Sequence, residues 1–368
     1  MANPFGRRDF LQAAAVLGGA AAMGALQLAR AATVDVPVVD RLAIQVLVDG
    51  AFDLFLRPGQ VNGVSIAPAG PFSDYRRSLH NEWGLSLWLE SQRGAERRSM
   101  LLDFGYTPEV LANNMELIGV NPSTLDALIV SHGHYDHFGG LIGFLDRFRK
   151  VLPADMKLYA GGEDNFCHRL TRSGTPGQFT DFGMLDRRAL GARRVTTVLA
   201  EDPVVIAGQA FTTGRIKRSS IEKVLPNTLV EFGMKDGVGC DAGRYVAADM
   251  VGKTVPDEHL HEHATCFNVR DKGLVVISSC GHVGIVNSVR QAQEVSGVEK
   301  VHAIVGGFHL GPAPKDYLEQ VVGEIRKLKP DVLIPMHCSG LNFVQEARAQ
   351  MPANVLVSTT GSRITFGA

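Results

Sequence analysis

The sequence predicts an α/β fold in which buried strands alternate with helices. Apolar runs of strand length alternate with segments of helical periodicity, and several of these runs end in a histidine. The 368 residues are 45% hydrophobic and 20% charged, an ordinary globular composition that can bury a large core. The net charge of −1 argues against nucleic acid or an anionic membrane as the main partner.

The first 32 residues resemble a twin-arginine signal peptide. Arg7-Arg8 is followed by Phe10-Leu11, a Gly/Ala-rich stretch and Ala29-Arg30-Ala31, which fits the small-x-small cleavage rule. We expect the mature chain to begin near Ala32, and we read an uncleaved membrane anchor as the alternative.

The organisation expected from this leader is a signal peptide over residues 1–32 and one catalytic domain over residues 33–368. The twin-arginine export machinery would be a partner, the protein would be periplasmic, and no stable membrane span would remain after cleavage. The twin-arginine route carries folded proteins, often with a cofactor already inserted, and a metal site loaded before export is consistent with it.

The chain has five cysteines, an odd number that leaves at least one unpaired. Their spacing shows no disulfide framework, so we expect mostly free thiols. They are Cys167, Cys240, Cys266, Cys280 and Cys338.

Secondary structure follows from hydrophobic periodicity and from turn residues. The expected strands cover residues 41–50, 85–89, 99–103, 125–130, 157–160, 204–206, 273–279, 300–305 and 331–335. The expected helices cover residues 107–118, 138–148 and 315–328, with another that begins near Gly284. We expect long loops over residues 57–80, where the loop could cover a pocket, and 172–182.

The most informative stretch is residues 131–140, directly after the strand at 125–130. It contains His132, His134, Asp136 and His137. Imidazole nitrogen and carboxylate oxygen are good ligands for divalent transition metals. His132 and His134 can aim at one ion, and Asp136 and His137 at a second one roughly 3.5–4 Å away. The alternative is a polar loop of solvated histidines.

This stretch resembles a known signature. Residues 132–137 have the His-x-His-x-Asp-His pattern of the metallo-β-lactamase superfamily, followed by Gly139-Gly140. The resemblance implies an αββα sandwich, with two mixed sheets face to face, helices on both outer faces and a metal centre along one edge. In such proteins an Asp at the position of Asp103 supports the metal loop by hydrogen bonds. Asp103 could equally be a strand-terminating residue.

Further candidate ligands follow later strands. Many superfamily members have another metal-binding His in mid-chain, where this sequence has residues 211–214 and no His, and His282 can supply that imidazole. His337 ends the last strand and His309 the strand before it. Cys280 stands where many relatives keep a bridging Asp, so thiolate ligation and a buried inert Cys are both open.

His259, His261 and His263 alternate in the stretch 258–263. Alternation would place all three on one face of a strand. We prefer a polar, half-exposed strand to the alternative that they are auxiliary metal ligands.

Residues 280–287, 306–310 and 335–340 resemble one branch of the superfamily, the proteins grouped with dihydropterin ribofuranosyl-aminobenzene phosphate synthase. A twin-arginine leader fits poorly with a cytosolic pterin pathway. The branch therefore informs the fold and the site more than the substrate.

From these residues we predict a metal-dependent hydrolase of an ester-like bond in a small molecule, with a phosphoester or phosphodiester ahead of a lactone or thioester. His132, His134 and His282 would hold one divalent ion, and Asp136, His137 and His337 the other. Zinc is favoured, and iron and manganese also suit these ligands. Asp136 could also act as a base, and His309 would contact the substrate or stabilise developing charge.

Two alternatives remain. One is a synthase-like transferase, in which the basic residues 215–218 would clamp a phosphate unless they form a solvated loop. The other is a periplasmic ligand- or metal-binding effector that keeps the fold without turnover.

Overall fold

The computed structural model describes residues 33–367 except 71, 73, 176, 226, 227 and 245. The expected signal peptide, residues 1–32, lies outside the described residues. Within the described part, no helix is both long enough and apolar enough to span a membrane.

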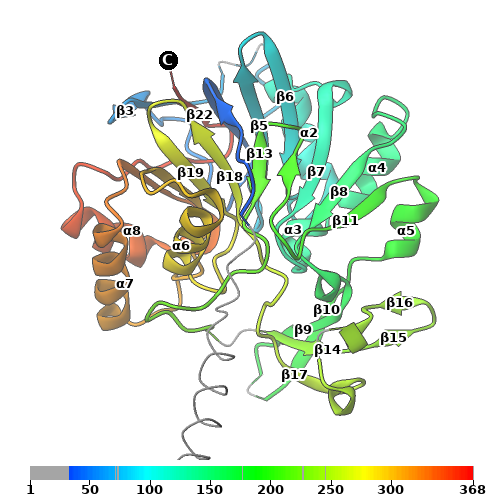
Figure 1. Ribbon diagram of the computed structural model, residues 1–368. Coiled ribbons are helices and arrows are strands. Elements are labelled where there is room, and N and C mark those ends of the chain that lie inside the picture. Colours follow the sequence, from blue (N-terminus) through cyan, green and yellow to red (C-terminus); the bar gives the residue numbers. More distant parts are fainter. Residues whose placement is uncertain are drawn as a thin grey trace, which may run out of the picture. The chain divides into compact units, whose positions relative to one another are not determined.

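Strands from residues 41–199, together with one strand near the C-terminus, build a nine-stranded mixed sheet (Figure 1). Its spatial order is β11 (Thr196–Leu199), β8 (Lys157–Ala160), β7 (Leu125–Val130), β6 (Glu96–Leu102), β5 (Ser86–Arg93), β2 (Arg41–Val48), β22 (Arg363–Phe366), β4 (Val64–Ala67) and β3 (Gly59–Val61). β6, β7, β8 and β11 are parallel, and the remaining pairs are antiparallel. The predicted loop over residues 57–80 is wrong in part, because β3 and β4 form a hairpin at this edge of the sheet.

The second half of the chain builds a seven-stranded sheet. It contains β12 (Val205–Ile206), β13 (Ala210–Thr212), β18 (Thr265–Val269), β19 (Gly273–Ser278), β20 (Val301–Gly306) and β21 (Val332–Pro335), and β1 (Val38–Val39) pairs with β18. β19, β20 and β21 are parallel. Because parallel strands end at the same edge, the three segments that follow them start side by side.

The two sheets pack face to face around a shared core. In β6, Met100 and Leu102 enter this inner core, whereas Leu101 packs with the helices outside. β19 does the same, since Ile277 lies in the inner core and Val276 in the outer one. Side chains alternate between the two faces of a strand, so both faces of these strands are buried.

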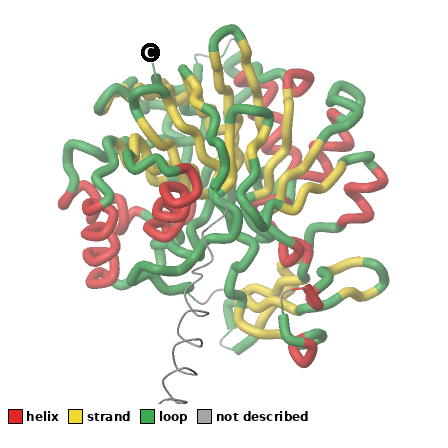
Figure 2. The backbone as a smooth tube through the Cα atoms, in the orientation of Figure 1, coloured by secondary structure: helices red, strands yellow, loops and turns green. Residues whose placement is uncertain are grey.

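Helices cover both outer faces (Figure 2). One side carries α2 (Pro108–Ile118), α4 (Leu141–Phe148) and α5 (Arg187–Ala192), and the other carries α6 (Ile285–Ser296), α7 (Lys315–Lys327) and α8 (Leu341–Gln350). Local sequence fixes the ends of α2: Thr107 caps its first turn, Pro108 follows, and Gly119 ends it in the left-handed conformation. The predicted αββα sandwich is confirmed.

A small four-stranded sheet stands apart from the sandwich core. Its order is β10 (Phe179–Gly183), β9 (His168–Arg172), β14 (Thr228–Glu231) and β17 (Thr254–Pro256), with a separate hairpin of β15 (Met234–Lys235) and β16 (Val238–Gly239). The predicted loop over 172–182 therefore contains a strand. A disulfide joins Cys167 to Cys240 in this region, which the cysteine spacing did not predict. The other three cysteines are free and buried.

Short helices complete the described chain. They are α3 (Tyr135–Phe138) and the 3₁₀ helices η1 (Pro122–Thr124), η2 (Glu163–Phe166), η3 (Ala242–Arg244), η4 (Ala248–Met250) and η5 (His337–Ser339).

Candidate metal centre

Strands of both sheets deliver polar side chains to one edge of the sandwich. Asp103 follows β6, His132 to His137 follow β7, Cys280 and His282 follow β19, His309 follows β20, and His337 follows β21. This is the edge at which the sequence places the metal centre.

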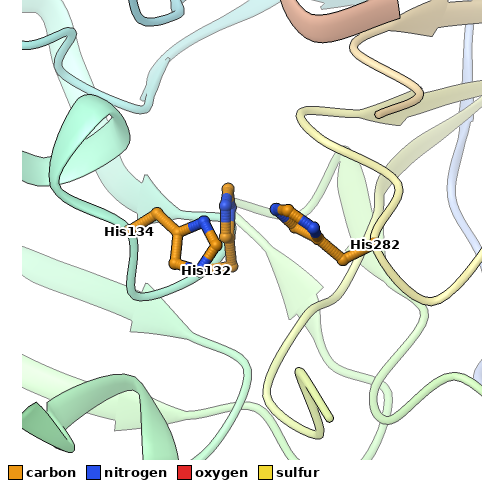
Figure 3. Close-up of side chains that lie close together, drawn as sticks. All are labelled: His132, His134 and His282. Carbon is orange, nitrogen blue, oxygen red and sulfur yellow. The ribbon is translucent and has the colours of Figure 1, made fainter. Parts of the chain in front are cut away.

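The first trio of predicted ligands lies together. Ligand atoms of His132, His134 and His282 are within 4.8 Å of one another, and all three side chains are buried. Figure 3 shows the three rings converging, two from the loop after β7 and one from the loop after β19. Nε2 of His132 and both nitrogens of His282 have no hydrogen-bond partner among the described residues. Buried polar atoms are normally satisfied, and a divalent ion suits this set of nitrogen donors.

The second trio is Asp136, His137 and His337, whose ligand atoms also lie within 4.8 Å of one another. Oδ2 of Asp136 is 3.3 Å from Nε2 of His337. Nε2 of His137 is buried without a hydrogen-bond partner among the described residues. One carboxylate and two imidazoles are a common donor set for a divalent transition metal.

Cys280 lies between the two trios. Its Sγ is within 4.8 Å of ligand atoms of His132 and His137, and it forms a further group with His309 and Cys338. Nδ1 of His309 is 3.6 Å from Sγ of Cys280. Cys280 was expected to be either a metal ligand or a buried inert cysteine. The structure places its buried thiol at the cluster, a position that is compatible with the ligand role. Cys338 was not predicted as part of the site.

Asp103 sets the orientation of the first histidine loop. Its carboxylate accepts the backbone N–H of Ser131 at 2.8 Å, the hydroxyl of Ser131 at 2.7 Å and Nδ1–H of His137 at 2.8 Å. Because the hydroxyl proton of Ser131 is directed to Asp103, its oxygen accepts Nδ1–H of His132 at 2.9 Å. Both histidines then keep their Nε2 lone pair for an ion. Of the two roles considered for Asp103, the supporting one fits these contacts.

Two further buried carboxylates hold the later loops, and the sequence did not predict them. Asp49 accepts the backbone N–H of His337 at 2.8 Å, and Glu262 accepts those of His282 at 3.0 Å and Val283 at 2.7 Å. Burial raises the pKa of Asp49 to about 6 and that of Glu262 to about 7, despite these donors. Asp49 directly follows a buried strand, as Asp103 does, and that shared position could have identified it.

The stretch 258–263 differs from its prediction. It forms a loop between β17 and β18 in which all three histidines are buried, so the half-exposed strand is wrong. The ring of His259 stacks on that of His282, with centroids 4.0 Å apart, and His259 forms another possible ligand group with His134 and Asp257.

The other two histidines of this loop contact protein groups. His261 Nδ1 lies 2.8 Å from a carboxylate oxygen of Asp164, and His263 Nε2–H donates to the carbonyl of Val130 at 3.0 Å. Of the three histidines, only His259 shares a group of possible ligands with a histidine of the first loop.

Burial governs the charge of the cluster. It holds the pKa of His132 and of His282 well below the usual range, and neighbouring histidines add to the effect, so both are neutral donors. His337 differs: burial would lower its pKa, but Cys338 and Asp136 outweigh it and raise the pKa to about 9. In the metal-free protein the second trio thus holds an ion pair between Asp136 and His337.

Several residues of the site have a strained backbone. Asp103, His259, His309 and His337 have φ values of 59°, 50°, 48° and 48°. Such positions cost free energy and are kept where the surroundings impose them, often at functional sites. Gly133 meets a different demand, because a Cβ there would lie 2.5 Å from a guanidinium nitrogen of Arg169.

A pocket of about 630 Å³ opens beside the cluster. Its lining includes Trp83, Arg172, Leu225, His309, His337 and Cys338. Trp83 is partly exposed, and its ring centroid is 4.8 Å from that of His337. The pocket thus brings an aromatic ring and a cationic side chain next to the proposed ligands.

Two groups that could bind an anion make local contacts instead. The N-terminus of α6 is occupied by Glu222, which accepts the backbone N–H groups of Val286 and Asn287 at 3.0 and 3.2 Å. In the basic stretch 215–218, Lys217 pairs with Glu294, and Arg218 pairs with Glu258. These groups serve local contacts.

Comparisons with known proteins agree with this architecture. Residues 89–166 match the family model described as the metallo-beta-lactamase superfamily. The chain is 28% identical over 299 residues to 7,8-dihydropterin-6-methyl-4-(beta-D-ribofuranosyl)-aminobenzene-5'-phosphate synthase of Methanocaldococcus jannaschii, covering 78% of this chain and 91% of that protein. It is also 24% identical over 249 residues to a second protein of the same organism, MJ0448, covering 66% and 80% of the two chains.

Among solved structures, Tm1679, a metal-dependent hydrolase of the beta-lactamase superfamily, superposes with a TM-score of 0.62 at 19% identity, covering 88% of this chain and 98% of the other. The matched residues 89–166 contain the first histidine loop. The chain therefore has the metallo-β-lactamase fold, and its residues 89–166 are similar to the metallo-beta-lactamase superfamily.

Proposed function

We propose that this protein is a metal-dependent hydrolase of an ester-like bond in a small molecule, with a phosphoester or phosphodiester as the preferred substrate class. One observation carries the proposal. Two trios of buried donors, joined by Cys280, converge at one edge of the sandwich with unsatisfied imidazole nitrogens in both. A pair of divalent ions, with zinc favoured, matches this donor set.

His132, His134 and His282 would hold one ion, and Asp136, His137 and His337 the other, with Cys280 between them. Bound divalent ions supply Lewis acidity and lower the pKa of water from 15.7 toward about 7. Asp103 keeps the Nε2 lone pairs of His132 and His137 directed at the cluster through the hydrogen bonds described above.

The pocket residues would bind and orient the substrate. His309 faces the cluster from the pocket wall, where it can donate a hydrogen bond to an oxygen that gains negative charge. Arg172 offers a guanidinium for a phosphate oxygen, and Trp83 offers a flat apolar surface. An anionic ester fits this combination better than a neutral lactone, because a lactone has no negatively charged oxygen to pair with the guanidinium of Arg172.

The experiment combines metal analysis with a substrate panel. Purified protein is analysed for metal and assayed on a phosphomonoester, a phosphodiester, a lactone and a thioester, before and after chelation and metal addition. The proposal expects chelator-sensitive turnover of a phosphoester and its loss in a His134→Ala, His137→Ala double variant. Unchanged metal content and hydrolysis in that variant would refute the assignment. His168→Ala is the matched control, because His168 lies in the small sheet and pairs with Asp181 and Glu231.

A second candidate, a synthase-like transferase, is favoured by the 28% identity to the aminobenzene-phosphate synthase. We choose Arg172 as its phosphate clamp, because Lys217 and Arg218 of the basic stretch pair with Glu294 and Glu258. Incubation with a dihydropterin and a ribofuranosyl-aminobenzene phosphate, followed by product analysis, separates the two functions. Formation of a joined product without release of phosphate by hydrolysis would support the transferase.

We also propose export to the periplasm through the twin-arginine route. The motif at Arg7-Arg8 motivates it, and the disulfide between Cys167 and Cys240 suits an oxidising compartment. Cell fractionation of the full chain and of an Arg7→Lys, Arg8→Lys variant tests it. Equal distribution of the two proteins would rule the route out.

A further inference from the structure

Two free cysteines lie against each other beside the metal centre. Sγ of Cys280 is 3.1 Å from Sγ of Cys338, although 58 positions separate the residues in the chain. Cys280 follows β19 and Cys338 follows β21, and these two strands flank β20. The contact therefore joins the ends of two strands that are not neighbours.

The end of β20 makes room for this contact. A Cβ at Gly307 would lie 2.8 Å from Sγ of Cys338 and 2.2 Å from the carbonyl oxygen of Ser279. A side chain at this position would push apart the two turns that carry the cysteines. The glycine thus permits an approach that the sheet alone would prevent.

The surroundings favour reaction at this pair. The backbone N–H of His309 donates to Sγ of Cys338 at 3.2 Å, which holds this sulfur beside Sγ of Cys280. Cys338 also lines the pocket of about 630 Å³, which gives small molecules a path to it. Cys266 offers a contrast, because it is buried within β18, where burial raises the pKa of its thiol.

We propose that Cys280 and Cys338 form an oxidation-sensitive dithiol site, which closes to a disulfide on reaction with a peroxide. The sulfur atoms need to approach by only about 1 Å to reach the S–S bond length of about 2.05 Å. The Cys338 thiol gives up its proton as its sulfur attacks one peroxide oxygen, and the O–O bond breaks to give a sulfenic acid and a hydroxide, which takes up this proton to become water. The Cys280 thiol then attacks the sulfenic sulfur, the S–O bond breaks, and a second water leaves. Two thiols are oxidised, and one hydrogen peroxide is reduced to two waters.

Closure has a consequence for the metal centre, and this part rests on the proposed function. Sγ of Cys280 lies within 4.8 Å of ligand atoms of His132 and His137. The thiolate is a metal ligand, whereas a disulfide sulfur has lost the negative charge. An occupied metal centre and a closed disulfide therefore oppose each other.

The test uses the full chain, stripped of metal by a chelator and treated with hydrogen peroxide. Free thiols are counted after denaturation, and disulfides are mapped by mass spectrometry of peptides without reduction. Of the three free cysteines, two should disappear, and a peptide linking Cys280 to Cys338 should appear. A thiol reductant should remove this peptide. Oxidation to sulfinic or sulfonic acid without the linked peptide would overturn the proposal, as would a link to Cys266.

Variants and metal provide the controls. Cys266→Ala should still form the linked peptide, whereas Cys338→Ser should not. If Cys266→Ala forms no linked peptide, the proposal is contradicted, whether or not Cys338→Ser folds. Metal-loaded protein should react at least about ten-fold more slowly, because the ion competes for the Cys280 thiolate. Equal rates with and without metal would overturn the coupling to the metal centre. Disulfide mapping needs no substrate, so its result is independent of whether the protein proves to be a hydrolase.

Discussion

Two histidine-rich loops of this protein have the same residue pattern and different surroundings. The loop at His132–His137 follows β7, and the loop at His259–His263 precedes β18. Both contain the spacing His-x-His, and all of these histidines are buried. In the first loop, serine and aspartate occupy one ring nitrogen of His132 and His137 and leave the other free. In the second, His261 and His263 bond to groups of the fold itself.

The difference shows that spacing alone does not identify a metal ligand. A histidine becomes a candidate ligand when a ring nitrogen without a hydrogen-bond partner lies close to further donors, as in the two trios. Nδ1 of His263 also lacks a partner among the described residues, but it belongs to no such group. The carboxylate that provides the fixed contact for the first loop, Asp103, comes from the neighbouring strand β6. The second loop uses a carboxylate in the same way, but Asp164 orients His261 toward the buried Arg169 and not toward the trios.

The largest expected effect compares one histidine from each loop. His137→Ala should lower metal affinity by more than about 100-fold, because it removes a proposed ligand and not merely a support. His263→Ala should retain the metal and instead lose about 1–3 kcal/mol of unfolding free energy, because the Val130 carbonyl loses its partner. Metal titration and chemical denaturation of both variants give the two values. Equal loss of metal from both would abolish the distinction between the loops.

The next effect compares the two carboxylates. Asp103→Asn should lower metal affinity by about 10–100-fold, because an amide cannot accept from both Ser131 and His137 with the same strength or hold the same tautomers. Asp164→Asn should change metal affinity less, and should lower stability, since His261 loses its charged acceptor. Isothermal titration with zinc after chelation measures the affinities. A larger effect on affinity from Asp164→Asn would reverse the proposed roles.

A pH effect separates a charged contact of the first loop, between Asp136 and His337, from a neutral histidine of the second, His263. In the metal-free protein the pKa of His337 is raised to about 9 beside Asp136, above the ordinary value of about 6.5. The contribution of protonated His337 to the free energy of unfolding is therefore fully present below pH 6.5 and is lost as the pH rises through 9. The loss is on the order of 3 kcal/mol. Burial lowers the pKa of His263, so its contribution is present above pH 6.5 and falls on acidification.

Urea unfolding of chelated protein between pH 6 and pH 9.5 measures this effect. His337→Gln should flatten the decline on the alkaline side, and His263→Gln should leave that decline in place. A decline that is unchanged in His337→Gln would assign it to another group.

Much of this architecture could be predicted from the sequence because it is encoded locally. The strand before His132 is a continuous apolar run, and the caps of α2 are read directly from Thr107, Pro108 and Gly119. The donors His282 and His337 were also identifiable, because each ends an apolar run, and the structure brings each to the loop after β7. Strand ends are where a sheet gathers side chains from distant parts of the chain.

The remainder depends on contacts that no local pattern contains. The alternation at His259–His263 fits a strand, but each histidine contacts a group that is distant in sequence. His261 contacts Asp164, His263 contacts Val130, and His259 stacks on His282. The disulfide between Cys167 and Cys240 spans 73 positions and follows from the folding of the small sheet. The approach of Cys338 to Cys280 depends on Gly307 of an intervening strand. Long-range packing decides all three.

The smallest expected effect concerns His259, the histidine of the second loop that shares a group of possible ligands with the first. Its ring stacks on His282, and its Nε2 is 3.3 Å from Nε2 of His134. If it acts by positioning these two histidines, His259→Gln should lower zinc affinity by about ten-fold or less and leave the number of bound ions unchanged. If it is itself a ligand, through the group with His134 and Asp257, the variant should bind fewer ions. Elemental analysis at saturating zinc distinguishes the two roles, and because the ring of His259 is already engaged in the stack on His282, we expect the number of ions to hold.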